Sequence, residues 1–453
     1  MTERTYYGFN SSQDVINLQT KYSLFSRVAN IMFYVTVDAG FDRTLMKQAI
    51  NKLFERHDCL RITFVKKKGK IEQYFVDHRE VGRIPERNFE TQTAMFKFMD
   101  KHRVAQVNPF LGQTLDVVFA KNPDKKDTII FKVSHYVCDS YGIGVLVNDL
   151  FAIYEALRDG KPMPAMPSSF EKVLQKDLEY KSNEEAKAKD KEFFKNLATV
   201  KHPEHPTYCG LHGNNSERWL KLKKKGWFSV PYLFVKCDTD GYRMVIPAAV
   251  SEKIFSYCEI SKVSLSSFLF YCTCIATSLI NDRCKAQFPL DLIEGRGTLY
   301  ERKCAGTKVQ NTCVYAEVDY EKNFSENLLQ CYNEQQDLYR HTRLSYLEVE
   351  QMYHNQWKYS MISQVFNFCF SLIPFKMPKG VNLQLYTNGK GALVAYIAMI
   401  LNVDTNEIYV NYDVQRKMIT SAQLMDFQSL LVHVIEAVLK NPDEKLGVVF
   451  PEK

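Results

Sequence analysis

The spacing of apolar residues predicts several helices that each turn one face toward a core. Across residues 143–157 apolar side chains recur at intervals of three and four, and the run ends at Gly160 with prolines beyond it. This spacing is typical of an amphipathic helix. The same pattern follows Asp42, a candidate helix N-cap, and recurs across residues 424–434 near the end of the chain.

Short apolar runs between these helices have the length of strands. In the first part of the chain they cover residues 60–64, 115–119 and 128–133, and two more cover residues 392–402 and 407–412. Helix and strand patterns therefore alternate along the chain. This order predicts a mixed α/β (α+β) fold class.

The length of the chain predicts two domains. Its 453 residues exceed the roughly 250 to 300 at which a single core stops growing. The composition of the chain changes over residues 165–240, which contain prolines, charged helix-like sequence and a stretch rich in His, Gly, Asn and Lys. We therefore expect an amino-terminal lobe at 1–175, a connecting segment and loop at 176–240, and a carboxy-terminal lobe at 241–453.

The second lobe is predicted to open with two successive helices. Ser251 and Ser264 are their candidate N-caps. The second helix, over residues 265–279, is apolar almost all round, so we expect it to be central in its lobe.

Composition is ordinary for a globular protein, with 45% apolar and 25% charged residues. The amino terminus lacks a basic segment followed by an apolar core, so we expect no secretory signal and a cytoplasmic location. The longest apolar runs, 268–280 and 392–403, are shorter than the roughly 18 residues that a membrane span needs. Twelve cysteines without paired spacing favour reduced thiols over a disulfide framework.

The net charge of +7 is modest for this length. Lysines cluster at residues 66–70 and 221–225, where they could attract an acidic partner or a phosphate-bearing cofactor. We favour the interpretation that these clusters are solvated hairpin tips. No nucleic-acid motif accompanies them, so we expect no nucleic-acid partner.

The stretch FKVSHYVCDSYG, residues 131–142, carries the candidate chemistry. His135 lies where the apolar run ends, and Asp139 follows at the first turn of the predicted helix. A histidine titrates near neutrality and can serve as a base, and helix-start amides favour a developing oxyanion nearby. An isolated pattern of this kind is also common for a core histidine followed by a helix N-cap, and the motif alone leaves that alternative open.

Two other groups of residues suggest chemistry that we consider weaker. Four possible zinc ligands occur within eleven residues: His202, His205, Cys209 and His212. Their spacing matches no standard zinc pattern, and prolines and glycines mark a loop, so we expect no metal site. Cys138 could be proposed as a nucleophile, but we expect it to pack in the core.

Four segments together resemble the chloramphenicol acetyltransferase-like acyltransferase superfamily. They are RHDCLRITF (56–64), NPFLGQTLDVVFAK (108–121), SHYVCDSYG (134–142) and VNYDVQRKMITSAQLMDFQSLLVHVIEAVL (410–439). The likeness covers nearly the whole chain. It is greatest to the condensation domains of nonribosomal peptide synthesis, and next to alcohol and wax-ester acyltransferases. We expect the domain to be free-standing here. The DFGWG signature of the plant branch is absent.

The resemblance implies two similarly folded lobes in a V shape, with a tunnel between them and His135 at its middle. It implies a thioester donor on phosphopantetheine, held by a carrier protein or coenzyme A, with no other cofactor. A small amine or alcohol would be the acceptor, and the protein would act as a monomer. His135 would be the general base, or would hold the nucleophile and the tetrahedral intermediate in place.

The resemblance also assigns supporting residues. Asp139 would point away from the substrate and pair with Arg296 of DLIEGRGT. Ser134 and Ser140 stand where condensation domains have the first histidine and the glycine of HHxxxDG.

Two further residues are candidates for tunnel or oxyanion contacts. They are Asn367, in SQVFNFCF, and Gly142. Asn367 could equally be an asparagine that ends an internal strand.

These features predict an enzyme that moves an acyl or aminoacyl group from a thioester to an amine or alcohol. The alternatives are a coenzyme A-dependent alcohol O-acyltransferase and a non-catalytic binding module that keeps the tunnel, which Ser134 and Ser140 alone support. The acyl chain and the acceptor are set by side chains from distant segments, which one sequence does not identify.

Overall fold

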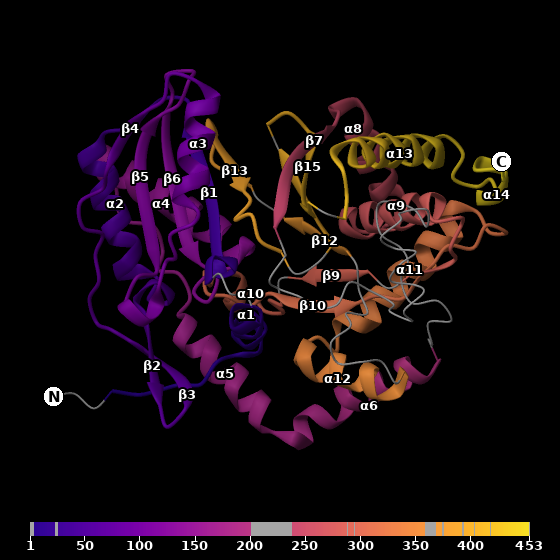
Figure 1. Ribbon diagram of the computed structural model, residues 1–453, viewed down its shortest axis with the longest axis horizontal. Coiled ribbons are helices and arrows are strands. Elements are labelled where there is room, and N and C mark those ends of the chain that lie inside the picture. The colour runs from indigo at the N-terminus through magenta and orange to yellow at the C-terminus, as the bar shows by residue number, and fades with distance from the viewer. Residues whose placement is uncertain are drawn as a thin grey trace. The chain divides into compact units, whose positions relative to one another are not determined.

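The computed structural model of the chain forms two compact units. Unit 1 comprises Met1–Ala186, Glu294–Val309 and Phe375–Lys390, and unit 2 comprises Lys187–Ile293, Gln310–Pro374 and Gly391–Lys453. Each unit contains sheets and helices (Figure 1). The structure describes residues 4–22, 26–200, 238–287, 289–293, 295–357, 368–373, 376–391, 394–402, 404–416 and 418–452.

Both units are assembled from segments that are not consecutive in sequence. Glu294–Val309 and Phe375–Lys390 come late in the chain and yet belong to unit 1. Apolar periodicity reports local structure and gives no signal for such long-range assembly. The division into 1–175, 176–240 and 241–453 stays a prediction.

A five-stranded sheet forms the centre of unit 1, in the order β13-β1-β6-β5-β4 (Figure 1). Its pairs are antiparallel except for β4 with β5. The predicted strands at 115–119 and 128–133 are confirmed as β5 and β6. The strands are β1 (Asn30–Val37), β4 (Glu86–Asn88), β5 (Leu115–Lys121), β6 (Asp127–Ser134) and β13 (Val381–Tyr386).

Two helices of unit 1 begin or end at the residues that the sequence predicted. Asp42 accepts a hydrogen bond from the Leu45 N–H, and Gly160 ends the long helix α4 in a left-handed conformation. Helices α2 and α4 pack against each other. The α-helices are α1 (Ser11–Tyr22), α2 (Arg43–Arg56), α3 (Gln92–His102), α4 (Ser140–Asp159), α5 (Phe170–Ser182) and α10 (Leu299–Arg302), and the 3-10 turns are η1 (Ser26–Ala29), η2 (Asp58–Arg61) and η3 (Pro109–Leu111).

The first lysine cluster lies on a hairpin of unit 1. Strands β2 (Ile62–Lys67) and β3 (Lys70–Phe75) are joined by Lys68 and Gly69, both with positive φ, and the whole 66–70 stretch is exposed. The interpretation as a solvated hairpin tip is confirmed here. Strand β2 begins two residues later than predicted, because Asp58–Arg61 form a 3-10 turn. The second cluster, 221–225, lies outside the described residues.

Unit 2 has a six-stranded sheet in the order β10-β9-β12-β14-β15-β7. The predicted strands at 392–402 and 407–412 are confirmed as β14 and β15. The strands are β7 (Thr239–Ile246), β9 (Leu290–Ile293), β10 (Gln310–Cys313), β12 (Phe368–Ile373), β14 (Ala395–Asn402) and β15 (Glu407–Gln415), with a small second sheet of β8 (Ala286–Gln287) and β11 (Ala316–Glu317).

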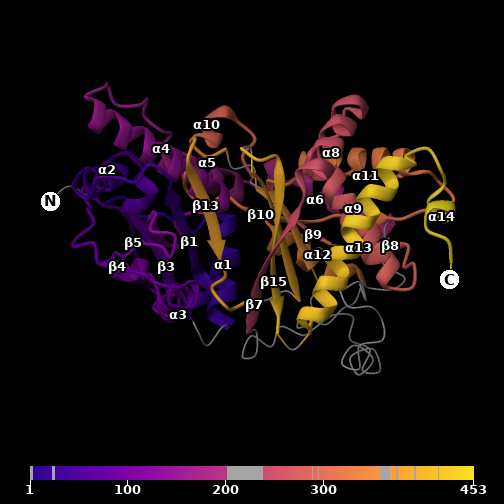
Figure 2. The same ribbon diagram turned by 90° about the horizontal axis from the view of Figure 1, so that it is seen from above.

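Helix α9 is the centre of the unit 2 core, as its all-round apolar sequence predicted. Every residue from Ser267 to Ser278 is buried, and α9 packs against α8, α11 and α13 (Figure 2). The helices of this unit are α8 (Ala248–Ser261), α9 (Leu265–Ile280), α11 (Phe324–Tyr339), α12 (Tyr346–Trp357), α13 (Ser421–Lys440), α14 (Leu446–Val449) and most of α6 (Glu184–Val200).

One of the two predicted caps in unit 2 is confirmed and one is wrong. Ser264 accepts a hydrogen bond from the Ser267 N–H at the start of α9. Ser251 instead lies buried inside α8, which begins at Ala248 directly after Pro247. The fixed φ of proline is already suited to a helix start, so α8 begins three residues before the serine.

Among the helices that the structure describes, α13 is long and apolar enough to cross a membrane, by length and composition alone. Helices α8 and α9 would form a second such segment only if their 114° bend lay within one span. Part of α13 packs in the unit 2 core, and core helices have the same composition. The buried core positions are Leu424, Phe427, Leu431, Val434, Ile435 and Val438. The expected absence of a membrane span therefore stays a prediction.

Candidate active site

His135 lies directly after strand β6, at the end of a buried run. The Ser134 N–H donates to the Thr114 carbonyl at 3.1 Å, and the His135 N–H donates to the Ala29 carbonyl at 2.6 Å. These main-chain bonds fix the chain where β6 ends and the turn begins. The His135 side chain is partly exposed, while its Nδ1 atom is buried.

Burial lowers the pKa of His135 below its ordinary value. Backbone groups of His135 itself and of Cys138, together with the charge of Asp139, act in the opposite direction but do not outweigh burial. The imidazole is therefore neutral near pH 7. A neutral imidazole can accept a proton, which is what a general base must do.

Asp139 is the N-cap of α4, and its carboxylate is 2% exposed. Its Oδ1 atom accepts a hydrogen bond from the Gly142 N–H at 2.8 Å. The alternative interpretation of the motif, a core histidine followed by a helix N-cap, is thus right that the aspartate is an N-cap. The carboxylate nevertheless has more hydrogen-bond partners than an N-cap needs.

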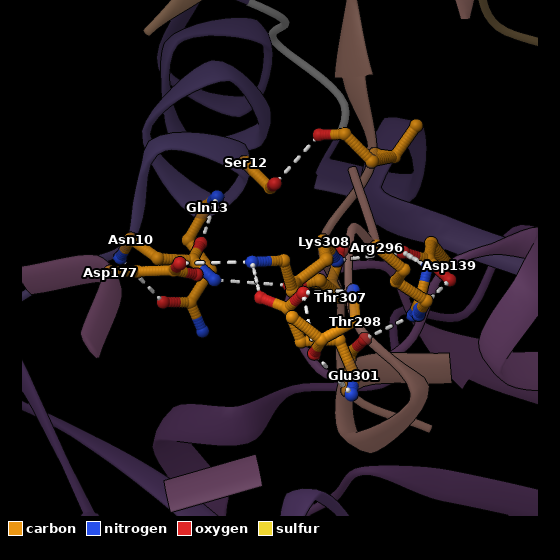
Figure 3. A network of polar contacts seen from close by, with 12 residues as sticks. Asn10, Ser12, Gln13, Asp139, Asp177, Arg296, Thr298, Glu301, Thr307 and Lys308 are labelled. Atoms are coloured by element: carbon orange, nitrogen blue, oxygen red, sulfur yellow. Dashed lines mark hydrogen bonds and ion pairs between the residues drawn. The ribbon is translucent and has the colours of Figure 1, made fainter. Parts of the chain in front are cut away.

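The structure places Arg296 against Asp139 (Figure 3). The guanidinium donates to both carboxylate oxygens, at 2.9 and 3.0 Å, and also to the Gly306 carbonyl at 2.6 Å. Burial lowers the pKa of Arg296, but the Asp139 carboxylate outweighs burial and raises it, so the guanidinium is charged.

The Asp139 carboxylate has all four of its acceptor positions filled. Oδ1 accepts from Gly142 and Arg296, and Oδ2 accepts from Arg296 and from the Lys308 N–H at 2.7 Å. A carboxylate in this state binds nothing further. Asp139 is therefore fitted to hold the motif in shape and not to contact a substrate.

Gly142 lies in a close packing contact. A Cβ atom at this position would lie 2.0 Å from the Ala305 carbonyl oxygen and 2.7 Å from the Cys138 Sγ atom, so only glycine fits. The Gly142 N–H already donates to Asp139. The structure thus gives Gly142 a packing role and does not leave its N–H available as an oxyanion donor.

The remaining motif residues are buried to different degrees. Ser134 is fully buried, and its hydroxyl has no hydrogen-bond partner within the described residues. Ser140 is partly buried at the first position of α4. Cys138 is fully buried, and burial raises the pKa of its thiol well above the ordinary value, so the packing role that we expected fits this position.

Several predicted residues lie outside the part of the chain that the structure describes. They are Asn367 and the candidate zinc ligands His202, His205, Cys209 and His212.

The RHDCLRITF segment positions α4 and α5. Arg56 donates to both carboxylate oxygens of Asp149 on α4, at 2.8 and 3.0 Å, and His57 contacts the same carboxylate at 3.0 Å. Asp58 accepts from the Phe170 N–H at 2.7 Å at the start of α5. The segment therefore fixes the helix that carries Asp139 at its start.

Sequence reasoning missed the residues that brace the motif from α1 and from the 306–309 segment. Gln13 donates to the Tyr136 carbonyl at 2.9 Å, one residue after His135. Lys308 donates its backbone N–H to Asp139. A lone lysine in the otherwise uncharged stretch CAGTKVQNTCVYA was the available signal for Lys308, and nothing local marks Gln13.

The comparisons with known proteins concern the family and the fold. Residues 4–208 match the condensation domain family model. A variant of the starter condensation domain of rhizomide synthetase, in complex with C8-CoA, superposes with a TM-score of 0.81 and 15% identity, covering 98% of this chain and 96% of that chain. The first condensation domain of the calcium-dependent antibiotic synthetase, in complex with a substrate analogue, superposes with a TM-score of 0.82 and 12% identity, covering 98% and 99%.

A curated relative gives the same family in sequence. Surfactin synthase subunit 1 of Bacillus subtilis (strain 168) is 21% identical over 459 aligned positions, which cover 98% of this chain and 12% of that protein. The chain thus spans about an eighth of the length of this relative. The predicted resemblance and the mixed α/β class with two lobes are confirmed. The V shape and the tunnel stay predictions.

Proposed function

We propose that this chain, which has the condensation-domain fold and matches the condensation family over residues 4–208, is an acyltransferase. It moves an acyl or aminoacyl group from a phosphopantetheine thioester to an amine or alcohol acceptor. The observation that carries the proposal is the imidazole of His135, which lies at a strand end in the same motif as a fully bonded aspartate.

In the proposed reaction His135 accepts a proton from the acceptor as the acceptor attacks the thioester carbonyl carbon. The new C–N or C–O bond forms first, and the C–S bond then breaks. The leaving thiolate takes the proton back from the imidazolium, so the products are an amide or ester and a free thiol. Charge and atoms balance without a metal or a redox partner.

The proposal gives Asp139 and Arg296 a structural role. Their pair is buried and fully bonded, so it holds the turn and the start of α4 while His135 does the chemistry. The Gly142 N–H at the start of α4 is engaged by Asp139, so we do not assign oxyanion stabilisation to that amide.

The relatives suggest the donor and the acceptor. One variant of the rhizomide synthetase domain was solved with C8-CoA, and another with C8-CoA and Leu-SNAC together. We therefore propose a carrier-bound or coenzyme A thioester as donor and favour an amine as acceptor, because a leucyl group carries an amine. We also propose that the protein acts as a cytoplasmic monomer.

A non-catalytic binding module is the second candidate, and one observation favours it. Ser134 replaces the first histidine of the HHxxxDG pattern, and its hydroxyl is buried without a partner in the described part of the chain. This position therefore lacks the larger polar ring that condensation domains usually have there.

The test compares His135→Ala with wild type and with His78→Ala, which removes an exposed histidine of unit 1. Carrier-loaded and coenzyme A-loaded acyl donors are offered with panels of amines and alcohols, and products are measured by mass spectrometry. Loss of a general base should lower kcat about 100-fold or more, while His78→Ala keeps wild-type turnover. Wild-type turnover by His135→Ala would show that His135 is not the general base. Donor binding by wild type without product from any acceptor would favour the binding module.

A further inference from the structure

We propose that Lys308 is a positioning residue for this site: its buried ammonium fastens the Gly306–Val309 segment in place, and through Asp139 that segment holds His135 in one orientation. The inference rests on the function proposed above. It concerns a residue whose side chain and main chain bind different elements of unit 1.

The Lys308 ammonium joins two acidic residues from separate elements. It lies 2.9 Å from Asp177 Oδ1 on α5 and 2.9 Å from Glu301 Oε1 on α10, and Lys308 as a whole is 8% exposed (Figure 3). Glu301 is itself held, because its Oε2 atom accepts from the N–H and the hydroxyl of Thr298. The ammonium thus connects acceptors on two different elements, α5 and α10.

The main chain of the same residue contacts the catalytic motif. The Lys308 N–H donates to Asp139 Oδ2 at 2.7 Å, the shortest of the four bonds to that carboxylate. A shift of the side chain therefore carries the N–H with it. The position of Asp139, and of the turn that starts at His135, depends on where Lys308 is anchored.

The start of α1 and the residue before it brace the same segment. Asn10 donates to the Thr307 carbonyl at 3.0 Å, and Ser12 donates to the Val309 carbonyl at 2.6 Å. Gln13, on the same helix, donates to the Tyr136 carbonyl beside His135. The start of α1, the 306–309 segment, Asp139 and the turn therefore form a closed ring of contacts. Figure 3 shows the part of this ring that joins Asn10 and Ser12 to the 306–309 segment and Lys308 to Asp139.

Stability alone does not account for a charged residue at position 308. Burying an ammonium and partly burying two carboxylates costs desolvation that offsets part of their attraction, and an apolar side chain of similar size is often as stabilising. A directional cluster differs from apolar packing in fixing positions, since its three charges and its hydrogen bonds hold at one geometry only.

The first experiment compares three full-length variants by steady-state kinetics. Lys308→Met removes the charge and keeps the length, Lys308→Arg keeps the charge, and Lys172→Met removes an exposed lysine from α5 as a control. Misplacement of the base should lower kcat roughly 10-fold to 100-fold in Lys308→Met, with KM for the donor within about twofold of wild type. Lys308→Arg should recover much of kcat, and Lys172→Met should match wild type.

Lys308→Met leaves two carboxylates without the Lys308 cation and could therefore lower stability. A second variant separates a loss of stability from a loss of positioning. The triple variant Lys308→Met, Asp177→Asn, Glu301→Gln removes all three charges together. If Lys308 contributes stability alone, the triple variant regains both wild-type Tm and wild-type kcat, and the proposal is overturned. If it positions the site, Tm recovers while kcat stays low.

A measurement that needs no turnover separates this inference from the proposed function. In protein labelled with 13C-histidine, the His135 signal is the one lost in His135→Gln. We expect one narrow signal in wild type and a broadened or split signal in Lys308→Met, with no change in Lys172→Met. If the wild-type protein were inactive with every donor and acceptor, the proposed function would be wrong. If the His135 signal were unchanged in Lys308→Met, the positioning role would be wrong.

Discussion

Two buried regions of the molecule are stabilised by different interactions. One is the polar cluster next to the His135 motif in unit 1, and the other is the apolar core around α9 in unit 2. In the cluster, Asp139, Arg296 and Lys308 meet through charged hydrogen bonds of 2.7 to 3.0 Å. In the core, α9 is buried along nearly its whole length among apolar and aromatic neighbours. The core gains from any apolar group of fitting volume, whereas the cluster works only with these groups in this geometry. The difference separates what stabilises the protein from what orients the site.

The largest effect should come from breaking the buried pair. Asp139→Asn keeps the shape of the side chain but leaves the Arg296 guanidinium buried without its anion, which should cost about 3 to 5 kcal/mol of unfolding free energy. Turnover should fall as well, because the turn loses its anchor. Chemical denaturation and the acyl-transfer assay measure the two effects.

The matched control is a second bidentate pair of the same two residue types. Arg416 donates to both oxygens of Asp240 in unit 2, but its side chain is 58% exposed. Solvent screening leaves such a pair worth about 0 to 1 kcal/mol. Equal losses of stability in Asp139→Asn and Asp240→Asn would show that burial does not set the value of the pair.

These two regions also differ in how far sequence could predict them. Periodicity alone located α9 and α4, and the four-residue spacing placed Asp139 at a helix start after His135. Arg296 came only from the family resemblance, because it is 157 residues away from Asp139. Lys308 was missed, since its partners depend on how α5 and α10 are arranged in space. Local patterns predict apolar burial, and directional contacts require the fold.

A smaller effect is expected from trimming the apolar region. Ile275→Val removes one buried methylene group from α9 and should cost about 0.5 to 1.5 kcal/mol of unfolding free energy. Turnover per folded molecule should not change, because Ile275 is an apolar side chain of the unit 2 core and His135 lies in unit 1. Ile260→Val, at an exposed position on α8, is the control and should leave the unfolding free energy as in wild type. A clear fall in kcat for Ile275→Val would contradict the claim that the apolar core affects stability and not turnover.

The mildest way to perturb the polar region is to change pH, because this titrates His135 without altering a contact. Burial holds the pKa of His135 below its ordinary value of 6.5, so the neutral base predominates above that lowered pKa and is lost as pH falls through it. The acid limb of kcat/KM should therefore lie below pH 6.5. Protonation is harder in the folded than in the unfolded protein, so His135 also makes stability decline as pH falls from about 6.5 through the folded pKa. A pH profile of kcat/KM, recorded beside denaturation midpoints for wild type and His135→Gln, checks both signs. An acid limb above pH 6.5 would mean that a partner charge, and not burial, controls the imidazole.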